Sequence, residues 1–230
     1  MLKLREGGHA DLTRFYTLFE VDFDSEELIS KLSLHKGLMN GSVELLVMYD
    51  DESQLETAYA LCFVKGMYDY VLLKYFGVLP WYREKGLGVE AMRLLNKRYA
   101  GRQGIIAEIT EFADPDPEHL KKLFKFFARF GYVEIDRDYR ISGTKAHLFV
   151  KPIKGTWDIA PIVHRILNDH YSRCLTRREM ARMIDIRPYD KKAEYRSTGR
   201  TAALPAVIVS PQGRALLLPH ASPHRGKCRA

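Results

Sequence analysis

The chain has 230 residues, 46% hydrophobic and 28% charged, which is typical of a globular protein of one or two domains. Its net charge of +7 lies wholly in residues 187–230, which hold nine Lys or Arg and two Asp or Glu. A basic segment can bind nucleic acid, but this one has little aromatic interleaving and no nucleic-acid motif, so we do not expect a nucleic-acid partner. No apolar run is long enough to span a bilayer, and residues 1–5 lack the apolar h-region of a signal peptide. The three cysteines are scattered and have no metal-ligand spacing. We therefore expect a cytoplasmic protein that binds neither membrane nor metal.

The first part of the chain predicts a strand, two helices and a hairpin. Residues 3–6, 43–49 and 58–65 have the apolar and β-branched character of strands. Asp11 is the expected N-cap of the first helix, and Ser25 that of the second. The side chains expected to face inward from these helices are Leu12, Phe15, Tyr16, Phe19, Leu28, Leu32 and Leu34.

A buried strand, a glycine-containing turn and an amphipathic helix follow. Residues 70–78 are aromatic and β-branched, and residues 89–99 repeat apolar side chains at helical spacing. The turn between them is Arg83-Glu84-Lys85-Gly86-Leu87-Gly88. Glycine lets a ligand approach the backbone closely, and the free amides and dipole of a helix start form an anion site suited to a pyrophosphate. Arg83 and Lys85 add positive charge.

Four more elements complete this part of the chain. Residues 104–111 predict a fifth strand, residues 119–130 a helix, and residues 132–136 and 146–150 two closing strands.

The turn resembles the acyl-CoA loop of the GNAT N-acetyltransferase superfamily, whose pattern Arg/Gln-x-x-Gly-x-Gly/Ala is matched by Arg83, Gly86 and Gly88. The lead-in Tyr75-Phe76-Gly77-Val78-Leu79-Pro80 is similar to the superfamily's fourth strand, and the elements of residues 1–151 follow the GNAT order. The resemblance implies an α/β (α+β) GNAT fold with a central mixed, mostly antiparallel sheet of about seven strands flanked by helices. Strands 4 and 5 would start side by side and then splay apart.

The resemblance also implies acetyl-CoA as co-substrate. Its pantetheine arm would insert between the splayed strands and pair with the fourth strand's backbone, while the phosphates would lie at the turn. An amine would arrive from the opposite side. The expected cofactor-binding residues are Phe76, Gly77, Val78, Arg83, Glu84, Lys85, Gly86, Leu87, Gly88, Val89 and Phe127.

The usual proton donor of such enzymes is missing from its expected position. Many GNAT enzymes carry a tyrosine in Phe-Tyr-x-x-x-Gly-Phe, where it protonates the leaving thiolate. Here the stretch is Phe126-Phe127-Ala128-Arg129-Phe130-Gly131-Tyr132, so that Phe127 takes the tyrosine's place. A thiolate is a tolerable leaving group without an acid, and Tyr132 or Tyr75 could serve instead.

Glu108 and Glu111 are the candidate bases for the acceptor amine. They lie on opposite faces of the fifth strand because their spacing is odd. Glu108 is flanked by apolar residues and is either a base or a buried carboxylate paired with a nearby lysine or tyrosine. Glu111, at the strand end, could instead be solvated. Lys74 stands on a strand where many relatives carry an acid.

Beyond the domain of residues 1–151, the sequence predicts a helical extension over residues 152–187 and a basic tail over residues 188–230. Near-helical spacing runs from Trp157 to Tyr171, and Thr176-Arg177-Arg178-Glu179 has the form of a capping box. The extension could form a wall of the substrate cleft or the face of a homodimer, and we expect the tail to be solvated.

Two classes of function stay open. The first is an N-acetyltransferase that moves an acetyl group from acetyl-CoA to a primary amine, on a small molecule or a peptide, by direct attack in a ternary complex. The second is a catalytically weak or inactive GNAT-fold protein that binds acyl-CoA as a sensor or interaction module. Phe127 favours the second class and Glu108 the first.

Overall fold

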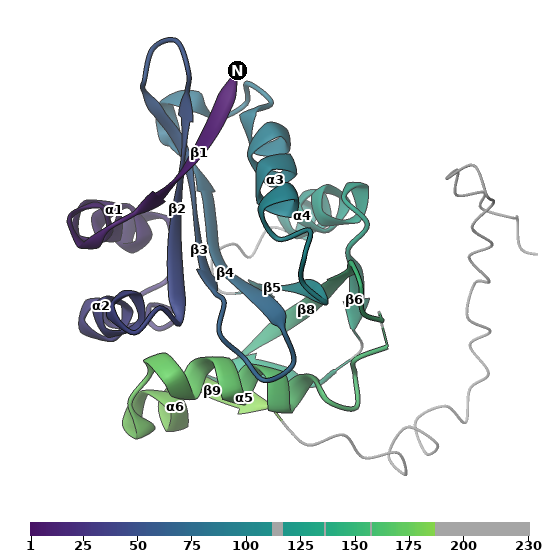
Figure 1. Ribbon diagram of the computed structural model, residues 1–230. Helices are drawn as coiled ribbons and strands as arrows, with labels where there is room; N and C mark the ends of the chain where they lie inside the picture. The colour runs from purple at the N-terminus through teal and green to yellow at the C-terminus, as the bar shows by residue number, and fades with distance from the viewer. Residues whose placement is uncertain (112–116, 136, 157, 187–230) are drawn as a thin grey trace, which may run out of the picture. The chain divides into compact units, whose positions relative to one another are not determined.

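The computed structural model describes residues 1–111, 117–135, 137–156 and 158–186 (Figure 1). The expected basic tail and Trp157 lie outside these described residues. Within the described ranges, no helix has the length and apolar character needed to cross a membrane.

The elements follow the predicted order, with two additional short strands. The first part holds β1 (Leu2–Gly7), α1 (His9–Asp22), α2 (Lys31–Met39), β2 (Val43–Asp50), β3 (Glu56–Phe63) and β4 (Tyr70–Val78). The middle part holds α3 (Leu87–Arg98), β5 (Gly104–Thr110), α4 (Pro117–Arg129), β6 (Val133–Ile135) and β8 (Thr144–Pro152). The sequence did not predict β7 (Tyr139–Ile141) or β9 (Ile184–Ile186), because three residues carry too little alternation to be recognised.

The sheet confirms the expected splay. Its strand order is β1-β2-β3-β4-β5-β8-β7-β9, with β6 also paired to β8, and its only parallel pair among the described strands is β4–β5. That pairing runs from Tyr70 opposite Gly104 to Leu73 opposite Ala107 and then stops, although β4 continues to Val78 and β5 to Thr110. Beyond Leu73 the two strands therefore present unpaired edges to each other.

A bulge in β4 lies at the point where the splay begins. Leu61 of β3 pairs with Tyr75, whereas the next residue, Cys62, pairs with Leu73. Lys74 is consequently the extra residue of the bulge, and such a residue bends its strand and redirects the neighbouring side chains.

Helices cover both faces of the sheet (Figure 1). One core contains Phe15 and Phe19 of α1, and the other contains Met92 and Leu95 of α3 together with Phe127 of α4. Both cores are buried, so the sheet is apolar on its two faces, as its near-continuous hydrophobic strands require.

The segment after Pro152 belongs to the first of these cores. Helix α5 (Val163–Cys174) buries Val163, Ile166 and Tyr171, and α6 (Arg177–Met183) follows it. The capping box predicted at Thr176 is confirmed, because its hydroxyl accepts from the Glu179 amide. Strand β9 then pairs antiparallel with β7.

Three expectations for the first two helices were wrong. The N-cap of α1 is Gly8, not Asp11. Asp11 is the third residue of the helix, and its carboxylate accepts a hydrogen bond from the Gly8 amide. Helix α2 begins at Lys31 and is capped by Ser30, not Ser25. Leu32 is 80% exposed, since the later start of the helix turns it outward. The residues between the helices form a turn, and this turn carries Glu27 into the interior.

Candidate functional site

A cleft of about 400 Å³ opens where β4 and β5 splay apart. Of the residues predicted to form the site, Phe76, Gly77, Val78, Arg83, Glu108 and Phe127 line it. The others lie beside it or elsewhere: Glu84, Lys85, Gly86, Leu87, Gly88 and Val89 form the adjoining turn and the first turn of α3, and Glu111 is not a lining residue. The cleft thus joins the glycine turn to Glu108.

The turn before α3 has the backbone that its glycines suggest. Gly86 is the N-cap and lies in the left-handed region, with φ at 75°. An added Cβ would meet no atom within 4 Å, so conformation and not space requires glycine there. A Cβ on Gly88 would make only ordinary contact, 3.5 Å from Val78. Because the first amides of a helix lack carbonyl acceptors, this end of α3 offers donors to an anion.

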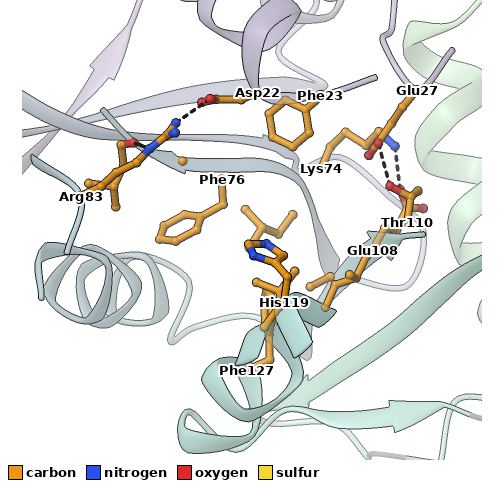
Figure 2. Close-up of a pocket in the computed structure, with 16 residues that line it drawn as sticks. Asp22, Phe23, Glu27, Lys74, Phe76, Arg83, Glu108, Thr110, His119 and Phe127 are labelled. Carbon is orange, nitrogen blue, oxygen red and sulfur yellow. Dashed lines mark hydrogen bonds and ion pairs between the residues drawn. The ribbon is translucent and has the colours of Figure 1, made fainter. Parts of the chain in front are cut away.

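Arg83 closes one end of the cleft through an ion pair. Its guanidinium donates to Asp22 of α1 at 2.5 Å, and its Nε donates to the Val78 carbonyl at 3.0 Å (Figure 2). Asp22 also accepts from the Tyr59 hydroxyl at 2.8 Å. Arg83 is half exposed, so an incoming anion could compete with Asp22 for it.

Gly77 is required by packing on the β3 side of its strand. A Cβ at this position would lie 2.5 Å from the Tyr59 ring and its hydroxyl oxygen. Any larger residue would push β4 away from Tyr59 and distort the edge of the cleft.

Glu108 is held by three donors at the centre of the splay. Its Oε2 accepts from Lys74 Nζ at 3.1 Å and from the Tyr171 hydroxyl at 2.5 Å, while its Oε1 accepts from the Tyr139 hydroxyl at 2.6 Å. The side chains of Lys74 and Glu108 are 0% and 1% exposed. Burial raises the pKa of both tyrosines well above its usual value, so their hydroxyls stay protonated and donate. Of the two alternatives considered from the sequence, the structure shows the pairing: Glu108 is a buried carboxylate bonded to a lysine and two tyrosines.

Glu111 lies at the end of β5 in a separate cluster. Its carboxylate contacts His147 Nε2 at 2.9 Å and Lys145 Nζ at 3.4 Å. The hydrogen bond with His147 holds the pKa of Glu111 below its usual value. The same imidazole reaches Glu134 through Nδ1 at 2.7 Å. Of the two candidate bases, the structure brings only Glu108 into the cleft.

Phe127 is 5% exposed and packs edge-to-face against Tyr132, with 5.1 Å between ring centroids. The Tyr132 hydroxyl donates to Asn96 at 3.2 Å, within the core beneath α3. Neither Tyr132 nor Tyr75 lines the cleft. The position of the missing tyrosine is therefore filled by an apolar wall.

Several cleft residues were not anticipated from the sequence, and two of them are polar side chains that contact each other. Glu27, in the turn between α1 and α2, is 4% exposed, and Thr110 at the end of β5 donates its hydroxyl to Glu27 Oε2 at 2.7 Å (Figure 2). The turn has no hydrophobic periodicity, and the sequence predicted that Glu27 lies in the first turn of a helix capped by Ser25. No sequence signal therefore indicated that the Glu27 side chain enters the cleft. His119 of α4 also lines the cleft. Among the described residues no cluster of three or more His, Cys, Asp or Glu could hold a metal ion.

The sequence matches no protein-family model and no curated protein. Solved structures do resemble it. A putative GNAT-family acetyltransferase from Bacteroides thetaiotaomicron aligns at a TM-score of 0.59, with 17% identity, over 74% of this chain and 96% of that one. Arabidopsis thaliana NAA60 in complex with acetyl-CoA aligns at 0.52, with 16% identity, over 67% and 100%. Vibrio cholerae spermidine N-acetyltransferase in complex with CoA and spermine aligns at 0.50, with 11% identity, over 66% and 95%. Together with the splayed sheet, this likeness shows that the chain has the GNAT fold.

Proposed function

We propose that this protein is an acyl-CoA-dependent N-acyltransferase that moves an acetyl group from acetyl-CoA to a primary amine in a ternary complex. One observation carries the proposal: a single cleft runs from Arg83 in the glycine turn to the buried carboxyl groups of Glu27 and Glu108 at the splay, and the amide-rich start of α3 adjoins its Arg83 end. Structures of the same fold with acetyl-CoA, or with CoA and spermine, support the choice of both substrates.

The cofactor end of the cleft suits a long, amide-bearing thioester with a phosphate end. The edge of β4 from Lys74 to Val78 lacks a strand partner on the β5 side and can pair with amides. Phe76 and Phe127 supply apolar walls, and the start of α3 supplies donors for phosphate oxygens. Acetyl-CoA would contribute an activated acyl group whose C–S bond breaks as the C–N bond forms.

The acceptor end would handle the amine and its protons. Glu108 has three of about four lone-pair positions filled, which leaves room for one contact with the amine or a bridging water. We assign it to the amine on this ground. If substitution of Glu108 leaves turnover unchanged, we assign the role of base to Glu111, which is hydrogen-bonded to His147. Phe127 would pack beside the thioester without donating a proton.

Thiol release in the presence of acetyl-CoA and an amine panel tests the proposal. The panel should contain butylamine, phenethylamine, spermidine and a short peptide with a free amino terminus, and calorimetry should measure CoA affinity in parallel. Amine-dependent thiol release with a matching acetylated product is the expected result. CoA binding without release for any amine would favour the inactive acyl-CoA-binding module, and absence of CoA binding would contradict both functions.

A further inference from the structure

The environment of Glu27 differs from that of Glu108, although both carboxylates lie at the acceptor end of the cleft. Glu27 Oε2 accepts one hydrogen bond, from Thr110, and no ion pair reaches this carboxylate from any residue that the structure describes. The Lys74 ammonium forms its ion pair with Glu108. Among the described residues of the cleft, Glu108 therefore has a cationic partner and Glu27 has none.

The backbone around Glu27 is fixed from two sides. The Tyr75 hydroxyl donates to the Glu27 carbonyl at 3.1 Å and accepts from the Ile29 amide at 2.9 Å. The Ser142 hydroxyl donates to the Glu26 carbonyl at 2.7 Å. These bonds come from β4 and from the turn between β7 and β8, which together hold the α1–α2 turn in place. A carboxylate positioned this firmly is suited to meet a ligand without reorganisation.

A buried carboxylate without a cation is costly, because an isolated charge loses its hydration on leaving water. A glutamine could accept the same bond from Thr110 without that cost. A primary ammonium that enters the cleft would supply the missing positive charge and donors for the remaining lone pairs of Glu27. The apolar side chains of Phe23 and Phe76 also line this cleft and would exclude water from the contact.

We propose that Glu27 is the anionic subsite for the acceptor, binding the amine in its ammonium form and taking its proton. The proposal rests on the proposed N-acyltransferase function and specifies its substrate class: a cationic primary amine. Thr110 is a positioning residue that orients the Glu27 carboxylate. Glu108, held by Lys74 and the two tyrosines, lines the same cleft, and its remaining lone-pair position would still contact the amine or a bridging water.

The proton balance of the step is simple. One proton passes from the ammonium to Glu27, and the freed nitrogen lone pair forms the bond to the acyl carbon. The C–S bond breaks, and a second proton from the nitrogen goes to the leaving sulfur to give the thiol. Glu27 releases its proton to water before the next turnover, so that each cycle yields an amide, a thiol and one proton.

Glu27→Gln tests the proposal, with Glu26→Gln as a matched control. Glu26 carries the same charge on the adjacent residue, but it is exposed and does not line the cleft. We expect Glu27→Gln to lower kcat/KM for the amine about 100-fold or more while CoA affinity measured by calorimetry stays unchanged. Glu26→Gln should match the wild type in both measurements. Thermal unfolding of each variant verifies that the fold is kept.

A second readout does not depend on turnover. It compares the affinities of phenethylamine and of the neutral 2-phenylethanol, each titrated into the protein with CoA present. We expect the wild type to bind the amine more tightly than the alcohol and Glu27→Gln to lose this preference. Other titratable groups around Glu27 are the Tyr75 and Tyr139 hydroxyls, the Lys74–Glu108 pair and, in the lining of the same cleft, His119. Burial raises the pKa of both tyrosines well above its usual value, so neither ionises over the pH range of the assay.

Thr110→Val should reduce kcat/KM about fivefold, in line with one hydrogen bond to a carboxylate, and Thr110→Ser should restore it.

The outcomes separate the two proposals. Turnover in the wild type that Glu27→Gln keeps within about threefold would overturn the Glu27 subsite and leave the acetyltransferase standing. If the protein binds the amine more tightly than the alcohol, and this preference depends on Glu27, but no turnover occurs, then the Glu27 subsite stands and the acetyltransferase proposal is overturned. No preference and no turnover with any amine of the panel would overturn both.

Discussion

One continuous stretch, residues 76–89, forms or adjoins the end of the cleft that we propose binds the cofactor (the cofactor end). The end that we propose binds the amine (the acceptor end) takes its side chains from the α1–α2 turn, β4, β5, β7 and α5. The cofactor end presents mainly backbone: an unpaired strand edge and the start of a helix. The acceptor end is a buried network of ionised and hydroxyl side chains (Figure 2). A backbone site tolerates changes of side chain that keep its conformation. A buried charge network couples every member to the stability of the fold. Substitutions at the two ends should therefore differ in what they damage.

The largest effect is expected at the acceptor end from Lys74→Met. Removing the ammonium leaves Glu108 buried without a cation beside Glu27, which should lower the free energy of unfolding by about 3–5 kcal/mol. The double variant Lys74→Met/Glu108→Leu should recover most of this loss, since no buried charge is then left alone at that position. Urea denaturation measures both. A single variant within about 1 kcal/mol of wild type would show that the network is not coupled to stability.

Gly86→Val should damage the cofactor end with a smaller effect on the fold. Its left-handed backbone disfavours a branched residue, so we expect the turn to rearrange and CoA affinity to fall about 100-fold by calorimetry. Gly143→Val is the matched control, because Gly143 has a φ of 83° with open space around its Cβ but lies in the β7–β8 turn. The control should share the strain and keep the affinity. Equal loss in both variants would assign the effect to general destabilisation.

Phe127→Tyr tests the boundary between the two ends. A hydroxyl there would restore the acid that many GNAT enzymes use, so the rate of thiol release should rise by about 10-fold at most. No change would fit a protein that binds acyl-CoA without turnover. A substantial fall in rate would mean that Phe127 shapes the acceptor pocket or that another acid already serves.

The smallest effect concerns the C-terminal helices that support the acceptor end. Burial raises the pKa of Glu179, but hydrogen bonds from Ser30, Thr176 and Ser33 outweigh it and lower the pKa to about 2. Because the folded value lies below the unfolded one, the carboxylate stabilises the protein above about pH 5, and this contribution is lost as the pH falls toward 2. Glu179→Gln should therefore destabilise by about 0.5–2 kcal/mol at pH 7 and by almost nothing near pH 2.

Thermal unfolding of wild type and Glu179→Gln across this pH range measures the difference, with Glu20→Gln on the exposed side of α1 as control. A difference that stays constant with pH would show that the Glu179 charge does not tie α6 to α2.

The sequence predicted β4, the glycine turn and the start of α3 because their determinants are local. The aromatic and β-branched run of residues 70–78, the glycines at 86 and 88 and the helical spacing after them lie within thirty consecutive residues. The fold followed from the same kind of pattern, repeated along residues 1–151. Errors occurred where local signals were short or ambiguous: three-residue strands, and a turn in which Ser25 and Ser30 both resembled caps.

The sequence by itself determined the order of strands and helices, the glycine turn at the start of α3 and the presence of an apolar residue, Phe127, in place of the usual tyrosine. Only the tertiary structure decided which carboxylates enter the cleft and what accompanies them. Glu108 lies 34 positions from Lys74 and 63 from Tyr171, and Glu27 lies 83 from Thr110, and no periodicity reports such distant pairs. The physical reason is that a charge in the interior depends on its partners through space, whereas a helix start or a buried strand depends on its neighbours along the chain.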